Sequence, residues 1–206
     1  MRRVFASLIV LVWAAGCGEM AYRYMNDPSR DAWQKPKEVV DKLALAPGAR
    51  VADVGAGGGY FTWYLAQAVG HEGMVYAADI EETALRMIAQ EARARGIANV
   101  KPIRAKPDDA NLPEPVDLVF SCDTYHHMTD RIAYFRSLQR SLKPNGRIAI
   151  LDFHPHGFFS GLLGHGTAKE DVRREMEAAG YRLVSDYDLI DRQHFQIFSK
   201  REPEGS

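Results

Sequence analysis

Helix-like and strand-like segments alternate through most of this 206-residue chain, and this alternation limits the possible folds more than any other feature. Strands are predicted over 50–54, 74–78, 100–104, 116–120 and 147–151, and helices over 38–45, 61–69, 81–95 and 131–142. Strands joined through helices pair in parallel, because a crossover needs the length of a helix to return to the same edge of the sheet. The sequence therefore predicts an α/β fold, a parallel sheet flanked by helices.

The alternation stops near the end of the chain. Thr167 and Glu170 fit a capping box that would begin a helix over 167–179. Two strand-like runs follow, over 181–190 and 194–199, with only three residues between them. Because so short a gap allows a hairpin and excludes a crossover, one strand must run antiparallel. The sheet is expected to end in an antiparallel β-hairpin.

The first seventeen residues differ in composition from the rest. Two arginines precede an uncharged run over 4–15, which as a helix would reach about 18 Å, against about 30 Å for a hydrocarbon core. Small residues then precede Cys17, as in a bacterial lipoprotein signal. We predict a signal segment over 1–17, lipidation at Cys17 and a membrane anchor at the cell envelope. The alternatives are an unlipidated signal, an uncleaved anchor, or a cytoplasmic protein whose true start is Met20 or Met25.

The remaining chain is predicted to comprise a polar tether over 18–36, one domain over 37–200 and a tail over 201–206. The formal charge is -1, from 26 Lys and Arg against 27 Asp and Glu, which speaks against nucleic acid as a partner. Two cysteines supply neither a disulfide framework nor a thiolate metal cage. These features predict one globular domain and leave its oligomeric state open.

The first predicted strand runs into a glycine-rich loop with the sequence DVGAGGGY. Gly55, Gly57 and Gly59 allow the backbone to approach a ligand closely, and Tyr60 replaces the third glycine of a dinucleotide fingerprint. Acidic residues follow the ends of the strands, the edge where open α/β sheets bind ligands. They are Asp53, Asp79, Asp108, Asp109 and Asp123. Such an edge repels a pyrophosphate and attracts a cation such as S-adenosylmethionine (SAM).

Five motifs follow one another along the chain: VADVGAGGG at 51–59, Asp79, DDANLP at 108–113, DLVF at 117–120 and LKPNGR at 142–147. Through this ordered set the chain resembles the class I SAM-dependent methyltransferase superfamily over nearly the whole stretch from residue 37 to 199. The resemblance implies a Rossmann-like sheet with SAM as the cofactor. It also implies that the terminal hairpin separates this fold from nicotinamide-binding relatives.

The resemblance assigns cofactor contacts to particular residues. Gly55, Gly57 and Gly59 would wrap the methionine portion of SAM. Asp53 would lie near its ammonium group, and Asp79 would bind the ribose hydroxyls.

Three further acids and two histidines complete the expected site. Asp108 and Asp109 are alternatives for the contact to the adenine amino group, and Asp123 would line the mouth of the cofactor site. His126 and His127 are candidates for a base that takes the proton of the acceptor, because histidine titrates near neutral pH. His126 is preferred. The other interpretation is that one histidine packs the loop and the other is solvated.

Further candidates follow the fifth predicted strand. Asp152, His154 and His156 alternate as metal ligands on a strand would, but Pro155 disrupts strand geometry and no metal is expected. An apolar, glycine-flanked stretch over 158–164 would be a lid over a hydrophobic substrate, a membrane-facing patch or a packing loop.

The sequence therefore predicts a methyltransferase that moves a methyl group from SAM to a small, apolar acceptor. One alternative is a noncatalytic SAM-binding sensor at the cell envelope, and another is a methyltransferase that modifies proteins. Export of the domain conflicts with catalysis, because SAM is made in the cytoplasm.

Overall fold

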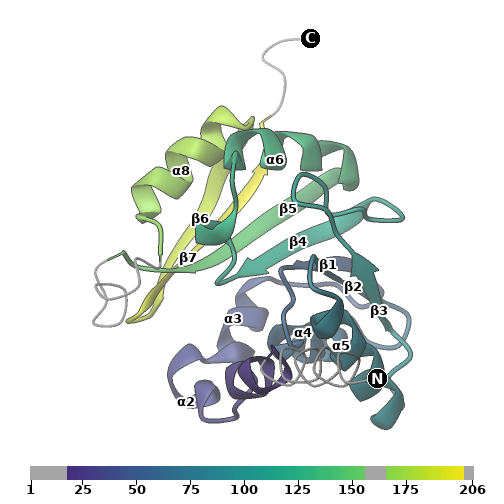
Figure 1. The fold of residues 1–206 in the computed structure, drawn as a ribbon. Coiled ribbons are helices and arrows are strands. Elements are labelled where there is room, and N and C mark those ends of the chain that lie inside the picture. The colour runs from purple at the N-terminus through teal and green to yellow at the C-terminus, as the bar shows by residue number, and fades with distance from the viewer. Residues whose placement is uncertain (1–17, 156–165, 202–206) are drawn as a thin grey trace, which may run out of the picture.

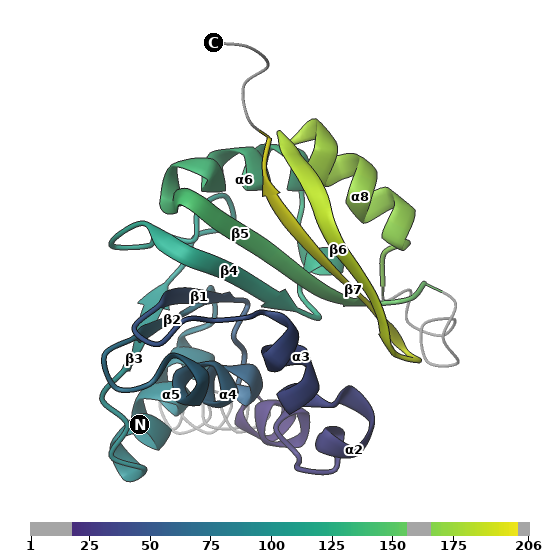
Figure 2. The same cartoon turned by 180° about the vertical axis from the view of Figure 1, so that it is seen from behind.

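The computed structural model describes residues 18–155 and 166–201. Its strands form one sheet in the order β3-β2-β1-β4-β5-β7-β6 (Figure 1, Figure 2). The strands are β1 (Arg50–Val54), β2 (Met74–Asp79), β3 (Val100–Arg104), β4 (Val116–Cys122), β5 (Leu142–Phe153), β6 (Tyr181–Ile190) and β7 (Gln193–Lys200). Strands β1 to β5 pair in parallel, and β7 runs antiparallel to both β5 and β6. The expected α/β fold with a terminal antiparallel hairpin is confirmed.

Helices cover both faces of the sheet (Figure 1). One face carries α3 (Pro36–Lys42), α4 (Tyr60–Val69) and α5 (Glu82–Ala94), and the other carries α6 (Arg131–Leu138) and α8 (Lys169–Ala178).

Successive residues of a strand contribute to the two cores in turn. In β5, Ala149 and Leu151 pack against the helices α3 to α5, whereas Ile148 and Ile150 pack against α6 and α8. A central strand buried on both faces reads as an uninterrupted apolar run, which is why the sequence shows it so clearly.

The segment that the sequence indicated as a tether is folded. A helix covers residues 18–25, α2 covers Arg30–Gln34, and α3 begins at Pro36. Gln34 is fully buried. The apolar pattern did not reveal this packing, because the side chains that face the domain are mainly polar.

The capping-box prediction for the last helix is wrong. Helix α8 begins at Lys169 with Ala168 at its N-cap and no side-chain cap, one residue later than the motif requires. Thr167 is buried instead, and its backbone oxygen lies 2.9 Å from Nε2 of His194.

Within the described ranges, none of the helices combines the length and the apolar character needed to cross a membrane. The predicted lipidation at Cys17, the candidate ligand His156 and the stretch over 158–164 fall outside those ranges.

Candidate cofactor and acceptor site

The glycine loop joins β1 to α4 through backbone conformations that favour glycine. Gly55, Gly57 and Gly59 have φ angles of 74°, 53° and 88°. A Cβ atom on Gly55 would lie only 2.2 Å from Oγ1 of Thr124, and one on Gly57 would lie 3.6 Å from the ring of Tyr22. The loop is therefore packed closely between the end of β4 and the helix over residues 18–25.

A hollow of about 420 Å³ opens at this loop, and we call it the loop cavity. Its volume is within the usual range for small-ligand sites. The predicted cofactor-binding residues that line it are Asp53, Gly55, Gly57, Asp79 and Asp123. Gly59 supplies the turn into α4 without lining the cavity.

Asp79 ties the end of β2 to the glycine loop. Its Oδ2 accepts a hydrogen bond from the backbone N–H of Gly57, and its Oδ1 accepts one from Glu81, each at 2.8 Å. A carboxylate has about four acceptor positions, so two remain for the hydroxyl groups of a ligand.

A buried carboxyl group, Asp53, and a half-buried one, Asp123, make the loop cavity suited to a cation. Burial raises the pKa of Asp53 to about 7, although Oδ2 accepts a hydrogen bond of 2.6 Å from Thr62. Burial also raises the pKa of Asp123 to about 6, against the opposing effect of Arg30. A cation bound between these groups would favour their ionised forms, because opposite charges lower a carboxyl pKa. The residues present therefore fit a cofactor that carries positive charge.

Asp123 is held by three side chains from two distant parts of the chain, α2 and β7. It has a left-handed φ of 53° just after β4, and its Oδ2 lies 3.3 Å from Arg30 and 3.4 Å from Gln34. Gln193 donates to its Oδ1, and Gln34 donates to Oε1 of Gln193 at 3.0 Å. The sequence indicated Asp123 but none of the three side chains that hold it, because they belong to segments without a site motif.

The structure places Asp108 and Asp109 beside the loop cavity, in a neighbouring hollow of about 420 Å³. Asp109 forms an ion pair of 2.8 Å with Arg140 and accepts a hydrogen bond from the backbone of Asn111. Asp108 is exposed. The two hollows share Tyr134, and the adenine contact remains a prediction.

The two candidate bases have different surroundings. His127 is exposed and lines the loop cavity, whereas His126 is not part of its lining. Nδ1 of His126 lies 2.7 Å from Oδ1 of Asp152, a carboxyl group that is 0% exposed. A carboxylate accepts hydrogen bonds, so the proton belongs on Nδ1 and Nε2 is the basic atom. The sequence had indicated Asp152 only as a metal ligand.

The other histidines after β5 do not form a metal centre with Asp152 in the part of the chain that the structure describes. His154 lies beside His194, with ring centroids 5.6 Å apart. No group of three or more His, Cys, Asp or Glu side chains in residues 18–155 and 166–201 could hold a metal ion.

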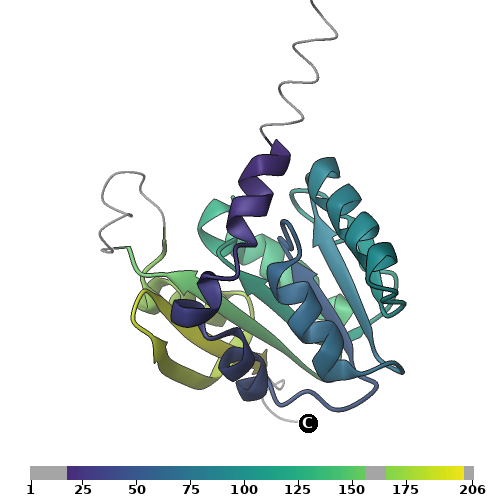
Figure 3. The same ribbon diagram turned by 90° about the horizontal axis from the view of Figure 1, so that it is seen from below.

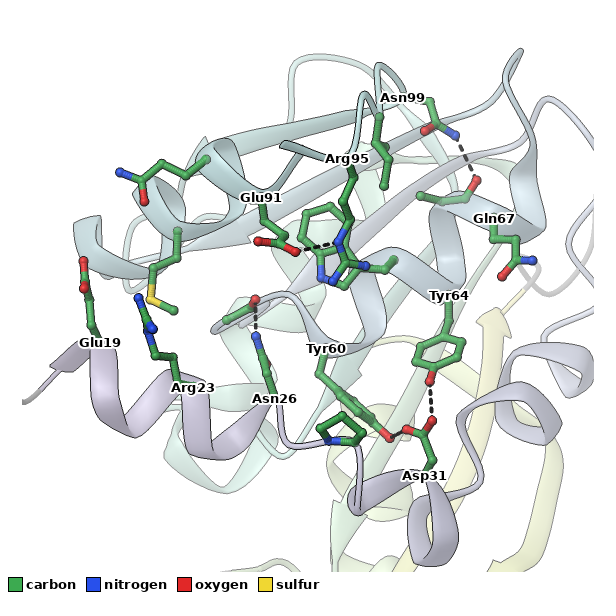
Figure 4. Close-up of a pocket in the computed structure, with 17 residues that line it drawn as sticks. Glu19, Arg23, Asn26, Asp31, Tyr60, Tyr64, Gln67, Glu91, Arg95 and Asn99 are labelled. Atoms are coloured by element: carbon green, nitrogen blue, oxygen red, sulfur yellow. Dashed lines mark hydrogen bonds and ion pairs between the residues drawn. The ribbon is translucent and has the colours of Figure 1, made fainter. Parts of the chain in front are cut away.

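A larger hollow of about 890 Å³, the lateral hollow, lies between the helix over 18–25, α4 and α5 (Figure 4). Two polar side chains along it are already engaged: Asn26 donates to the backbone oxygen of Gly58 at 2.6 Å, and Arg95 pairs with Glu91 at 2.6 Å. None of the acids that follow the strands lines it. The loop cavity is therefore the better candidate for a cationic cofactor.

This fold and this acidic cavity beside a glycine loop define the class: a SAM-dependent methyltransferase domain on a Rossmann-like sheet. The family described as "Methyltransferase domain" matches residues 45–191. The chain belongs to this methyltransferase domain family, and the family and fold imply SAM as the cofactor.

Known proteins agree with this assignment. A SAM-dependent methyltransferase from Aquifex aeolicus has a similar structure, with a TM-score of 0.78, 25% identity, and coverage of 87% of this chain and 96% of that one. The ubiquinone/menaquinone biosynthesis C-methyltransferases UbiE of Shewanella frigidimarina and Yersinia pestis are 31% and 37% identical over 119 residues. These matches cover 57% and 55% of this chain. They cover 47% and 46% of the relatives, so the chain spans about half the length of the curated relatives it matches.

Proposed function

We propose that this protein transfers the methyl group of SAM to a small, apolar acceptor. The observation that carries the proposal is the acidic loop cavity of about 420 Å³, with histidines on the strand-end segment beside it. Bound SAM supplies an electrophilic methyl group, which forms a bond to a nucleophilic atom of the acceptor as its bond to the sulfonium sulfur breaks and the neutral thioether leaves. The names of the UbiE relatives favour a carbon atom as the methylated position.

In this proposal the residues of the chain bind the cofactor and position it. Asp53 and Asp123 supply negative charge, and Asp79 offers its remaining acceptor positions to hydroxyl groups. Gly55 and Gly57 allow the backbone to approach the ligand without an intervening side chain. Alignment of the reacting groups supplies much of the rate in such a displacement.

We propose His126 as the base for the acceptor proton. Nε2 would take the proton, and Asp152 on Nδ1 would stabilise the imidazolium that results. His127 is the alternative, because it is the histidine that lines the loop cavity.

Calorimetric titration with SAM tests the cofactor half of the proposal. Asp79→Ala should weaken binding by about 1 to 3 kcal/mol, the cost of removing a charged hydrogen-bond partner. Asp188→Ala is the matched control, because that side chain is 92% exposed and lies on β6, an edge strand four places away from β1 and its glycine loop in the sheet. Equal affinity in Asp79→Ala and the wild type would remove Asp79 from the site.

Transfer of labelled methyl groups from SAM into native cell extracts tests catalysis. His126→Gln should lower turnover by about 10²- to 10⁴-fold while SAM affinity stays nearly unchanged, because a base acts only in the transition state. A large loss of turnover in His127→Gln, without one in His126→Gln, would identify His127 as the base.

The same extracts separate the alternative functions. Label in the protein fraction would favour a protein-modifying enzyme. A wild type that binds SAM and labels nothing would favour the noncatalytic sensor.

We further propose that residues 1–17 attach the protein to the cell envelope through an acylated Cys17. The uncharged run over 4–15 and the small residues before Cys17 support this. Mass spectrometry of the protein from its native cell should find the acylated cysteine, and Cys17→Ser should release the protein from membranes. An unmodified protein in the cytoplasm would contradict the proposal.

A further inference from the structure

The helix over residues 18–25 turns its polar side toward the domain. Glu19 pairs with Arg86 of α5 at 3.7 Å, and Asn26 donates a hydrogen bond to the glycine loop. Figure 4 shows Glu19, Arg23 and Asn26 extending from this helix toward α5 and the loop. These three residues recur at helical spacing, so they form one continuous polar side.

The opposite side of this helix is apolar and faces outward. Met20, Tyr24 and Met25 are 69%, 82% and 51% exposed. Across the described residues the other exposed large apolar side chains are Ile80 and Val184. A surface helix ordinarily turns its apolar side toward the core and its charged side toward water. This helix, on the outside of the domain in Figure 3, has the reverse orientation.

Two of the exposed apolar side chains adjoin the loop cavity. Met25 and Ile80 both line it, and so does Tyr22 from the same helix. The helix that carries the apolar side therefore also forms one wall of the cavity.

The chain sequence indicates what would cover this surface. Residues 4–15 carry no charge, and only Gly16 and Cys17 separate them from Gly18, the first residue that the structure describes. The three residue-to-residue steps from Ala15 to Gly18 span at most about 11 Å, so a bilayer that held this run would be within reach of Met20 and Tyr24. Tyrosine is a favoured residue at the boundary between lipid and water.

We propose that Met20, Tyr24, Met25 and Ile80 form a docking face for a lipid bilayer, so that the loop cavity takes its acceptor from the lipid phase. The docking of this face on a bilayer is independent of the proposed function. The statement that the acceptor comes from the lipid phase rests on the proposed methyl transfer.

Methionine oxidation of the full chain tests the docking face. The protein is mixed with vesicles of phosphatidylethanolamine and phosphatidylglycerol, treated with chloramine T and analysed by mass spectrometry. Met20 and Met25 should oxidise several-fold more slowly with vesicles than without them. The methionine introduced by Val184→Met, on β6 and away from the cavity, is the control and should oxidise equally fast in both samples.

Other outcomes of this experiment overturn the docking face. Full oxidation of Met20 and Met25 in chains that float with the vesicles would mean that the N-terminal run binds lipid while the face stays in water. Oxidation of Met20 and Met25 that slows with rising protein concentration in the absence of vesicles would show that a second copy of the chain covers the face.

The acceptor half is tested with labelled SAM and a native lipid extract. Tyr24→Glu should lower methyl transfer several-fold when the extract is embedded in vesicles, and leave transfer unchanged when it is dissolved in detergent. An equal loss in both media would overturn delivery from the bilayer. Calorimetry on the same samples keeps the hypotheses apart, since absent SAM binding would sink the proposed function and leave the oxidation result intact.

Discussion

The two walls of the loop cavity are built in different ways. One wall, over residues 53–58, is contiguous and depends on backbone conformation, with Asp79 accepting a hydrogen bond from the backbone N–H of Gly57. The other wall, over residues 22–30 and supported by the nearby Gln34, is held by side chains that meet partners far along the chain, such as Arg30 with Asp123. A wall made of backbone geometry can be read from a short motif and tolerates little change. A wall made of separate side-chain contacts leaves no motif in the sequence. Each of its contacts should contribute less to the free energy of unfolding than a glycine of the contiguous wall does.

The largest effect is expected at the contiguous wall. Gly55→Ala places a Cβ atom 2.7 Å from Cβ of Thr124, so a change of rotamer at Thr124 does not relieve the clash. Together with the left-handed φ, this overlap should lower the free energy of unfolding by about 2 to 5 kcal/mol. Urea denaturation measures it.

Gly48→Ala is the matched control for this substitution. Gly48 has a φ of 80°, and no atom lies within 4 Å of the place that a Cβ would take there. Gly48→Ala should lower the free energy of unfolding only by the cost of a left-handed φ for alanine, about 1 to 2 kcal/mol. If the two variants lose equal stability, close packing of the contiguous wall is not what makes it intolerant.

At the other wall, Gln34→Ala should have an intermediate effect. Gln34 is buried and donates toward Asp123 and Gln193, so its loss leaves buried acceptors with fewer partners. The free energy of unfolding should fall by about 1 to 3 kcal/mol. Gln67→Ala, at an exposed position of α4, should change stability by less than about 0.5 kcal/mol. A loss at Gln34 as large as that at Gly55 would erase the difference between the walls.

The same difference explains what the sequence could predict. The strands were recognisable because buried parallel strands are continuous apolar runs, and the glycine loop was recognisable because its residues are adjacent. Asp53, Asp79 and Asp123 could be expected at one edge, because the ends of parallel strands meet there. The pairing of His126 with Asp152 depends on how the segment after β4 lies across β5, which no local pattern encodes.

The folded segment over residues 18–34 could not be predicted for a related reason. Secondary-structure patterns detect an apolar side that faces a core, and here the side that faces the domain is polar. Arg30 and Gln34 are 93 and 159 residues away from Asp123 and Gln193 respectively, so their contacts exist only in the folded chain.

Acidity should act on the contiguous wall through Asp53, whose pKa is raised to about 7 in the folded protein. Unfolded aspartate has a pKa of about 4, so the folded state prefers the protonated acid and the free energy of unfolding falls as the pH rises toward 7. A cationic ligand prefers the ionised acid, so its affinity should change in the opposite direction. Calorimetry should show SAM binding strengthening by about tenfold from pH 6 to pH 8, as the ionised fraction rises from about one tenth to about nine tenths.

Asp53→Asn keeps an acceptor for the hydrogen bond from Thr62 and removes the titration. It should therefore bind SAM with little dependence on pH in this range. A pH profile that survives the substitution unchanged would transfer the effect to another group, such as Asp123.

The smallest effect is expected for Arg30→Met, and its direction should depend on pH. Arg30 pairs with Asp123 at 3.3 Å and opposes the rise in the pKa of that carboxyl, so its removal lets the pKa rise further. At pH 8 Asp123 remains ionised without its partner, and SAM should bind about threefold more tightly, because the cavity gains net negative charge. At pH 6 more of Asp123 is protonated, and SAM should bind about threefold more weakly. Arg23→Met, in the lateral hollow, should change neither value. If Arg30→Met shifts the affinity in the same direction at both pH values, Arg30 acts by packing on Tyr60, over which its guanidinium lies at 4.2 Å, and not through charge.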